Sequence, residues 1–263
     1  GWKEFYTPEQ FEKIKLGFTD KTLIAQEFPE TVEEAFLHSG RAAFSRDLVV
    51  KLGEKVSKPH YTGVLSDDGV KVRLKEEAGA ALSIWKVPRE QRQYIVSADV
   101  AEGVSGGDYS VAQVLDRASW EQVAVWRGHI EPGEFGSLLV KMGRFYNNAL
   151  LIPELNNHGW ATIERIKADG YPHLFKPSQL WSETNESKEG FPTNVKTRGL
   201  IISALRNALD ELTVVLNDAV TVGELQSAIV DDGEKVCAPE GYYDDCLMSL
   251  AIGVYCLKFF GLD

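Results

Sequence analysis

Acidic side chains stand at the ends of apolar segments in three separate parts of the chain. Asp99 ends the run YIVSA, Glu154 ends ALLIP, and Asp244 and Asp245 precede CLMSLAIGVY. Carboxylates that meet in a dry site repel one another, so their pKa values would rise unless cations neutralised them. Such oxygen ligands suit Mg²⁺ or Mn²⁺ rather than zinc. Two ions about 3.5–4 Å apart can bind the attacking water and the leaving oxygen in phosphodiester hydrolysis.

Each carboxylate also has a structural interpretation. Asp244 or Asp245 could cap the following helix and complement its dipole. Glu154 could be an exposed strand end, and Asp99 could merely begin a turn. The metal interpretation therefore depends on whether these separate positions converge in the fold.

A glycine-rich loop with a further acidic residue, Asp108, follows Asp99. Gly103, Gly106 and Gly107 would let a bulky backbone phosphate approach. Because Gly-Asp loops are often only turns, Asp108 is a secondary candidate ligand.

The elements that must position these residues alternate between strands and helices, so we predict an α/β fold. The predicted elements are strands YIVSADV, YSVAQVLD and EQVAVWRG as an antiparallel meander, a helix over Phe135–Phe145, the strand ALLIPE, a helix from about Trp160 to Ala168, a short strand near His173–Phe175, a helix capped by Asn194 and running to about Leu212, the brief strand TVVL, and helices over 218–229 and 243–260. This order fits a ribonuclease H-like fold of the resolvase and integrase type, with a mixed five-stranded sheet flanked by helices. If the first and fourth strands are parallel neighbours, Asp99 and Glu154 lie side by side at the carboxyl edge.

The first part of the chain is less regular. Thr31 and Glu34 form a capping box that predicts a short helix ending near Gly40. The residues around Asp67 predict a hairpin within VLSDDGVKVRL.

Length and composition limit the class of protein. The 263 residues, 44% of them hydrophobic, suit one large domain, or one domain with a tail. A net charge of −11 argues against a passive nucleic-acid coat but not against an enzyme that acts through bound cations. The odd set of Cys237, Cys246 and Cys256, without CxxC spacing, predicts a reducing interior with neither disulfides nor a zinc knuckle. The longest apolar run, Leu247–Leu257, is too short to span a bilayer, so we expect a buried helix and no membrane association.

Three motifs resemble those of one protein family. SADVAEGVSGGDYSV, LLIPELNNHGWATI and GYYDDCLMSLAIGVY are similar to the nuclease motifs of the large terminase subunits of tailed phages, which are DNA-packaging motors. QEFPETVEEAFLHSGRAAF, at 26–44, resembles the segment between the ATPase and nuclease domains of that family. GFPTNVKTRGLIISAL, at 190–205, resembles a fourth family block. The three motifs and the fourth block follow the family's order, and with the upstream segment the resemblance extends over most of the chain.

The resemblance implies a divalent-metal-dependent endodeoxyribonuclease that cuts concatemeric viral DNA with two Mg²⁺ or Mn²⁺ ions. By position, the catalytic metal ligands would be Asp99, Glu154 and one or both of Asp244 and Asp245. The sequence contains no GxxxxGK[ST] motif, so the resemblance implies the nuclease portion without its ATPase domain. The implied division is a linker or tail of the ATPase domain over 1–60 and a nuclease domain over 61–263, with a lead-in hairpin over 61–92 and a core over 93–263. The implied partners are double-stranded DNA, the ATPase domain of the full-length protein, the portal and the small terminase subunit, in the host bacterial cytoplasm.

Polar residues after Glu154 are secondary candidates. Asn156, Asn157 and His158 could orient a phosphate or hold a water, or could simply form a turn into the helix that starts at Gly159. Pro153 departs from the family pattern, and because proline cannot donate to a ladder we expect strand pairing to stop there.

Candidate DNA contacts cluster around the polar loop 177–193 and the next helix. Arg198 falls on the apolar face of that helix but in its first turn, so we predict that it points toward the carboxylates, although a structural salt bridge would explain it equally well. The other candidates are Lys188, Lys196, Arg206 and, in the loop, Trp181 as a stacking residue.

Three alternatives remain open from the sequence. A Holliday-junction resolvase or transposase-type nuclease shares the fold, but the segment EFPETVEEAF disfavours it. An actin-like ATPase or phosphotransfer domain also begins with a strand, an Asp and a glycine-rich loop, but needs a second such domain. A catalytically inactive packaging or scaffold module would not need the separate acidic motifs.

Overall fold

The computed structural model describes residue 7 and residues 42–177, 189–231, 233 and 235–259. The chain divides into two compact units: Gly1–Gly53 with Val222–Asp244, and Glu54–Thr221 with Asp245–Asp263. The helix predicted after Thr31 lies outside the described residues. The predicted division at residue 60 stays a prediction.

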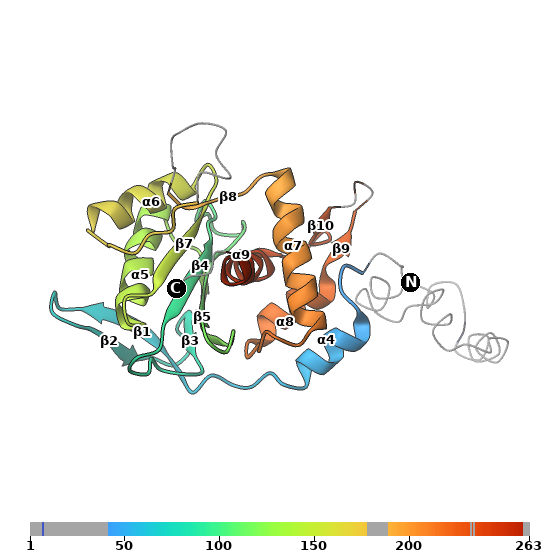
Figure 1. Cartoon of the computed structure of the whole chain (residues 1–263), viewed down its shortest axis with the longest axis horizontal. Helices are drawn as coiled ribbons and strands as arrows, with labels where there is room; N and C mark the ends of the chain where they lie inside the picture. The colour runs from blue at the N-terminus through green and yellow to red at the C-terminus, as the bar shows by residue number, and fades with distance from the viewer. Residues whose placement is uncertain (1–6, 8–41, 178–188, 232, 234, 260–263) are drawn as a thin grey trace. The chain divides into compact units, whose positions relative to one another are not determined.

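The larger unit is built on an eight-stranded mixed sheet in the order β2-β1-β3-β6-β5-β4-β7-β8 (Figure 1). Its strands are β1 (Tyr61–Asp67), β2 (Val72–Glu76), β3 (Leu82–Ile84), β4 (Tyr94–Asp99), β5 (Ser110–Asp116), β6 (Gln122–Gly128), β7 (Leu150–Leu155) and β8 (Phe191–Pro192). Strands β4, β5, β6 and β7 correspond to four strands that the sequence predicts, whereas β8 lies in the segment 177–193 that was predicted to be a polar loop. The sheet has eight strands because β3 pairs with β6 and joins the β1–β2 hairpin to it. With only three residues, β3 is too short to show a period.

The meander and the parallel crossover are confirmed. Strands β4, β5 and β6 pair antiparallel, and β7 pairs parallel to β4. The predicted hairpin is also confirmed, since β1 and β2 pair antiparallel from Asp67↔Val72 onward. Strands β4 and β5 are buried along almost their whole length, as strands covered on both faces must be.

Helices cover both faces of this sheet (Figure 1). On one face α5 (Pro132–Phe145) and α6 (Gly159–Ala168) pack with β4 and β7 through Phe135, Leu139 and Ile163. On the other face α9 (Asp245–Phe259) packs against β4, β5 and β7, and α7 (Val195–Asp210) packs against α9. Helix α5 begins before the predicted Phe135 because Glu131 caps it and Pro132 occupies its first position.

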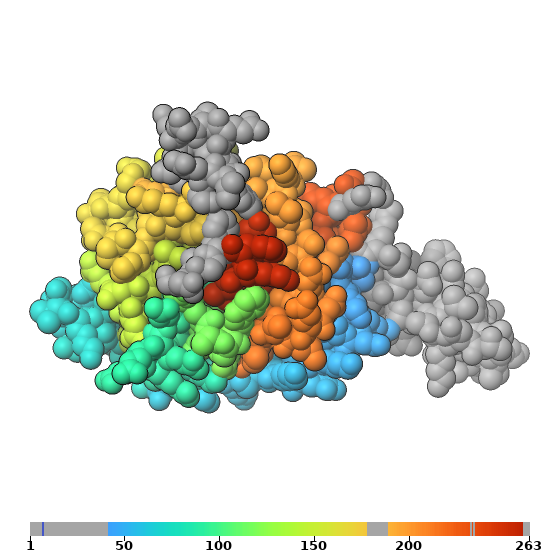
Figure 2. Space-filling view, in the orientation of Figure 1, coloured from blue at the N-terminus to red at the C-terminus, as the bar shows by residue number. Residues whose placement is uncertain are grey.

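Helix α9 is buried around its whole circumference from Asp245 to Cys256, as its apolar sequence predicts. It approaches β4 closely at Gly253, where an added Cβ would lie 2.6 Å from Ser97 Oγ. The helix begins at Asp245, so Asp244 precedes it instead of lying in its first turn. On the face drawn in Figure 2, dark red atoms of α9 reach the surface beside the orange α7, consistent with the exposure of Lys258 and Phe259 at the helix end.

Several predicted details of the helices and strands are wrong. The segment TVVL forms no strand, because only a single bridge joins Val215 to Glu121. The strand near Leu174 is likewise reduced to one bridge with Leu151. Helix α7 ends at Asp210, and Leu212, with a φ of 54° and 52% exposed, lies beyond its apolar face.

Pro153 does not stop strand pairing, contrary to the expectation from the sequence. It is in register with Ala98, and β7 continues into its pairing with β8. Leu151 exchanges backbone hydrogen bonds with the 173–175 segment on the side away from β4. Because backbone direction alternates along a strand, the nitrogen of Pro153 also faces away from β4, so the β4–β7 ladder loses no donor there.

The smaller unit contains α4 (Arg46–Gly53) and the antiparallel pair β9 (Ile229–Val230) and β10 (Val236–Cys237). Ala42 bridges to Ile229 within it. Helix α8 (Ala219–Ser227) continues from the larger unit into this one. In the described part of the chain, none of the helices combines the length and the apolar character that crossing a membrane requires.

Candidate active site at the carboxyl edge of the sheet

Asp99 and Glu154 occupy equivalent positions on two neighbouring parallel strands. The last register pair between β4 and β7 is Ala98↔Pro153, so Asp99 and Glu154 are the next residues on their strands. Neighbouring strands lie about 4.8 Å apart. The structure therefore brings these two predicted positions to one edge of the sheet.

Both side chains belong to the face that α9 covers. Ser97 faces α9, as its closeness to Gly253 shows, and side chains two residues apart in a strand share a face. Asp99 is therefore on the α9 side, and Glu154, in the same row, is on that side too. Asp99 is half-buried and Glu154 is 6% exposed.

Asn156 holds the carboxylate of Glu154 in place. Its Nδ2 donates to Glu154 Oε2 at 2.8 Å and to the Val100 carbonyl at 2.9 Å, so it bridges the ends of β7 and β4. Its Oδ1 accepts the N–H groups of His158 and Gly159, at 3.0 and 2.7 Å, and so fixes the start of α6. Asn156 therefore forms the predicted turn into α6 and also orients Glu154, while its role toward a phosphate or a water stays a prediction.

Asp245 joins the start of α9 to the glycine-rich loop. It is 5% exposed, and its Oδ2 accepts the backbone N–H of Tyr109 at 3.0 Å. Tyr109 directly precedes β5, whose residue Val111 pairs with Asp99. Asp245 is thus tied to the same sheet edge, although it lies far away in the sequence.

The other acidic candidates are placed less favourably. Asp108 is exposed in the loop beside Tyr109. Asp244 is half-buried and belongs to the smaller unit. The loop itself needs glycine at Gly103, whose φ is 85° and where an added Cβ would lie 2.3 Å from the Ile130 carbonyl oxygen.

The donor set at this edge has the right chemistry for a hard divalent cation, since Asp99, Glu154 and Asp245 all offer carboxylate oxygens. Within the described residues, however, no three His, Cys, Asp or Glu side chains are grouped closely enough to hold a metal ion. The fold thus places Asp99 and Glu154 in one row and joins Asp245 to the adjoining loop by a hydrogen bond, but the three carboxylates are not close enough together to form a metal site in this structure.

The candidate DNA contacts start at the same edge. Strand β8 pairs with Glu154 through Phe191 and leads directly into α7. As predicted, Asn194 caps α7 by accepting the N–H groups of Lys196 and Thr197, both at 3.0 Å. Arg198 and Arg206 are half-buried and Lys196 is exposed, while Asn157 is exposed and His158 half-buried before α6. Lys188 and Trp181 lie outside the described residues.

Three residues beside this edge were not among the predicted site residues: Tyr109, Arg127 and His129. The guanidinium carbon of Arg127 lies 3.4 Å from the centroid of the Tyr109 ring, and the His129 ring stacks on the same ring at 4.2 Å. Only the pairing of β5 with β6 brings these residues together, so no local pattern could have identified the group.

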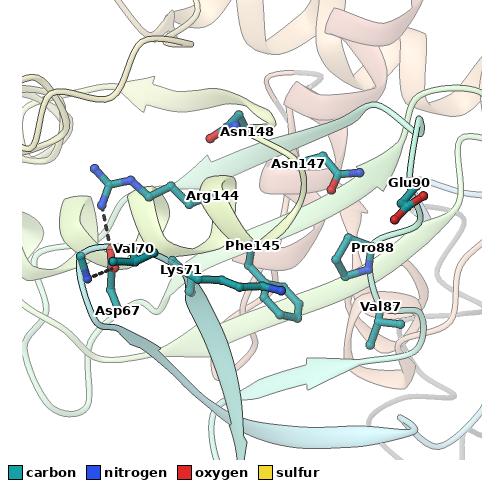
Figure 3. Close-up of a pocket in the computed structure, with 12 residues that line it drawn as sticks. Asp67, Val70, Lys71, Val87, Pro88, Glu90, Arg144, Phe145, Asn147 and Asn148 are labelled. Atoms are coloured by element: carbon teal, nitrogen blue, oxygen red, sulfur yellow. Dashed lines mark hydrogen bonds and ion pairs between the residues drawn. The ribbon is translucent and has the colours of Figure 1, made fainter.

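A pocket of about 750 Å³ lies at the opposite end of the same strands (Figure 3). It is lined by the β1–β2 turn, the segment before β4 and the loop after α5, and Arg144 pairs there with Asp67 at 2.7 Å. Asn147 lines this pocket, and its backbone is in the left-handed conformation. Its Nδ2 donates to the carbonyl groups of Arg89 and Arg92 at 2.7 and 3.0 Å. The pocket is separated from Asp99 by the length of β4, about 17 Å at about 3.3 Å per residue.

Comparison with solved structures identifies similar folds. The large terminase nuclease of the thermophilic phage G20c with bound magnesium matches with a TM-score of 0.58 and 17% identity over 81% of this chain and 96% of that one. The same protein with bound cobalt gives a TM-score of 0.57, again at 17% identity over 81% and 96% of the two chains. The large terminase nuclease domain of Thermus phage P74-26 gives a TM-score of 0.53 and 19% identity over 78% of this chain and 93% of that one.

No protein-family model matches the sequence. The structural likeness covers about four fifths of this chain and nearly all of each solved nuclease. The chain therefore has the ribonuclease H-like fold of the large terminase nuclease domains of phages.

Proposed function

We propose that this chain is a divalent-metal-dependent endonuclease that cuts double-stranded DNA during viral genome packaging. The observation that supports this most directly is the shared row of Asp99 and Glu154 on neighbouring parallel strands. Asp245 adds a third carboxylate at the start of the helix that covers their face. The likeness in fold to a terminase nuclease with bound magnesium supports the same interpretation.

In this proposal Asp99, Glu154 and Asp245 hold two Mg²⁺ or Mn²⁺ ions, with Asp244 and Asp108 as further candidate ligands. The bound ions would supply an activated water and charge stabilisation of the leaving oxygen in phosphodiester hydrolysis. Asn156 orients the carboxylate of Glu154, and the N–H of Tyr109 orients that of Asp245. Such hydrogen bonds around metal ligands fix their direction.

A net charge of −11 requires that DNA contact be local, since most of the surface repels phosphates. We therefore expect weak, sequence-independent binding with a shallow salt dependence, because few phosphates are neutralised. The proposed contacts are Lys188, Lys196, Arg198, Arg206, Asn157 and His158.

The proposed setting is the cutting of concatemeric DNA at a viral procapsid in the host bacterial cytoplasm. The four sequence blocks that resemble large terminases support this setting, as does the likeness to the G20c and P74-26 nucleases. The partners would then be an ATPase domain in the full-length protein, the portal and the small terminase subunit.

A plasmid-nicking assay tests the proposal. The purified chain should convert supercoiled plasmid to nicked and linear forms with Mg²⁺ or Mn²⁺ and should stop on chelation. Asp99→Asn should abolish cleavage while keeping the melting temperature of the unliganded protein. Full activity of Asp99→Asn, or no cleavage by the wild-type chain with either metal, would contradict the proposal.

Two substrates separate the alternatives within the same preparation. A strong preference for four-way junctions over linear duplex would favour the resolvase alternative. Steady ATP hydrolysis would favour the actin-like alternative, since the sequence contains no GxxxxGK[ST] phosphate loop.

A further inference from the structure

Arg127, Tyr109 and His129 form a stacked group next to the carboxylate edge. The guanidinium carbon of Arg127 lies 3.4 Å from the Tyr109 ring centroid. The His129 ring lies 4.2 Å from that centroid with an interplanar angle of 24°. Two planar groups cannot share one face of a ring at these separations, so the Tyr109 ring lies between the guanidinium and the imidazole.

This group is in register with the proposed metal ligands. Arg127 pairs with Val111, and Val111 pairs with Asp99, so the three residues form one row across β6, β5 and β4. Two strand spacings separate Arg127 from Asp99, which is about 10 Å.

The row also points to the α9 side of the sheet. Val111 and Val125 pack with Cys246 of α9, and Tyr109 packs against them. Arg127 is two residues from Val125 on the same strand and therefore lies on this face. Its half-buried side chain thus shares a face with Asp99 and Glu154.

Hydrogen bonds hold the stack to the candidate site. The Tyr109 N–H donates to Asp245, and His129 Nε2 lies 3.0 Å from the Gly107 carbonyl oxygen. The glycine-rich loop is thereby fixed between α9 and the end of β6. A guanidinium held against a ring loses less conformational entropy on binding than a mobile one.

We propose that Arg127, oriented by the ring of Tyr109, contacts a DNA phosphate that flanks the one to be cut. The proposal rests on the proposed nuclease function. A planar guanidinium can bind two phosphate oxygens at once, and the site lies on a chain whose net charge of −11 otherwise repels DNA. Arg127 is then a positioning residue for the substrate, separate from the contacts proposed on α7.

Duplex binding across a salt series, measured without divalent metal by fluorescence anisotropy, tests Arg127 directly. Arg127→Ala should weaken binding roughly 10-fold for every duplex sequence and reduce the log–log salt slope by about one phosphate. Arg127→Lys should restore the slope but not the full affinity. Arg117→Ala is the matched control, because Arg117 lies in the turn at the other end of the β5–β6 hairpin and should keep wild-type affinity and slope.

Single-turnover cleavage of the same duplex completes the test. Arg127→Ala should raise the half-saturating DNA concentration more than it lowers the maximal rate, and Tyr109→Leu should shift it in the same direction by less. An unchanged salt slope for Arg127→Ala, with or without a lower melting temperature, would overturn the proposal and leave the nuclease function standing. A reduced slope for Arg127→Ala, together with a wild-type chain that cannot cleave, would keep the DNA contact and overturn the nuclease function. Absence of DNA binding by the wild-type chain would overturn both.

Discussion

The two ends of the central strands hold buried carboxylates in different ways. Asp116, at the end near the start of β4, is 6% exposed, accepts the N–H groups of Ala118 and Ser119, and lies 3.4 Å from the Arg92 guanidinium. Glu154, at the other end, is also 6% exposed but is held by the neutral amide of Asn156. A neutral amide fixes the direction of a carboxylate without a positive charge that would compete with a bound cation. Both features suit a cation ligand.

Near the pocket, two more carboxylates are paired with arginines, as Asp116 is. Asp67 pairs with Arg144, and Asp68, in the β1–β2 turn, pairs with Arg73. Backbone N–H groups of the turn and, after them, the Arg73 guanidinium together lower the pKa of Asp68 to about 2. These carboxylates stabilise a turn, so the acidic side chains at the two ends of the strands have different roles.

The largest expected effect compares two equally buried acids. Glu154→Gln should reduce metal-dependent plasmid cleavage more than ~100-fold. Even the loss of a residue that only orients a metal ligand typically lowers metal affinity or activity about 10–100-fold. Asp116→Asn should leave cleavage near wild type, because its amide oxygen can still accept the turn N–H groups. Single-turnover rates well below the melting temperature check this. Equal losses for both variants would remove the distinction between the two ends.

Asn156 sharpens the comparison by one step. Asn156→Ala should lower cleavage or metal affinity about 10–100-fold, because Glu154 loses the donor that orients it. Raising the metal concentration should restore part of the rate. Glu164→Ala, which alters an exposed residue further along α6, is the control. A rate loss that excess metal cannot restore would point to collapse of the turn before α6.

The close approach of α9 to β4 gives a stability test. Gly253→Val should destabilise the protein by about 1–3 kcal/mol, because the added atoms meet Ser97 Oγ and Leu115 Cδ1. Gly199→Val in α7 is the matched control, since nothing lies within 4 Å of a Cβ there. Urea unfolding measures both. A smaller loss for Gly253→Val than for Gly199→Val would show that α9 is not tightly seated on β4.

The smallest effect concerns the pocket end. The Gly69 N–H and then Arg144 lower the pKa of Asp67, so its contribution is present at neutral pH and is lost as the pH falls through that lowered pKa. Asp67→Asn should cost less than about 1 kcal/mol at pH 7, because the pair is partly exposed. Urea unfolding at neutral and strongly acidic pH should show the difference shrinking in acid. A difference that grows in acid would contradict the assigned role.

Local patterns determined the elements that bear the carboxylates. Alternation and apolar runs predicted β4, β5, β6 and β7 because each period repeats within a single segment. Asn194 predicted the start of α7 because capping depends on the next few residues only. The acidic positions Asp99, Glu154 and Asp245 were noticed because each interrupts or borders an apolar run.

Only the tertiary structure decided which residues meet. The register of β4 with β7 aligns Asp99 with Glu154, and the packing of α9 brings Asp245 to Tyr109 across 136 residues of sequence. Arg127 joins that row through a pairing that no local period encodes. Register and helix packing depend on how distant apolar surfaces fit together, so the sequence determined the parts of this site and the fold determined their arrangement.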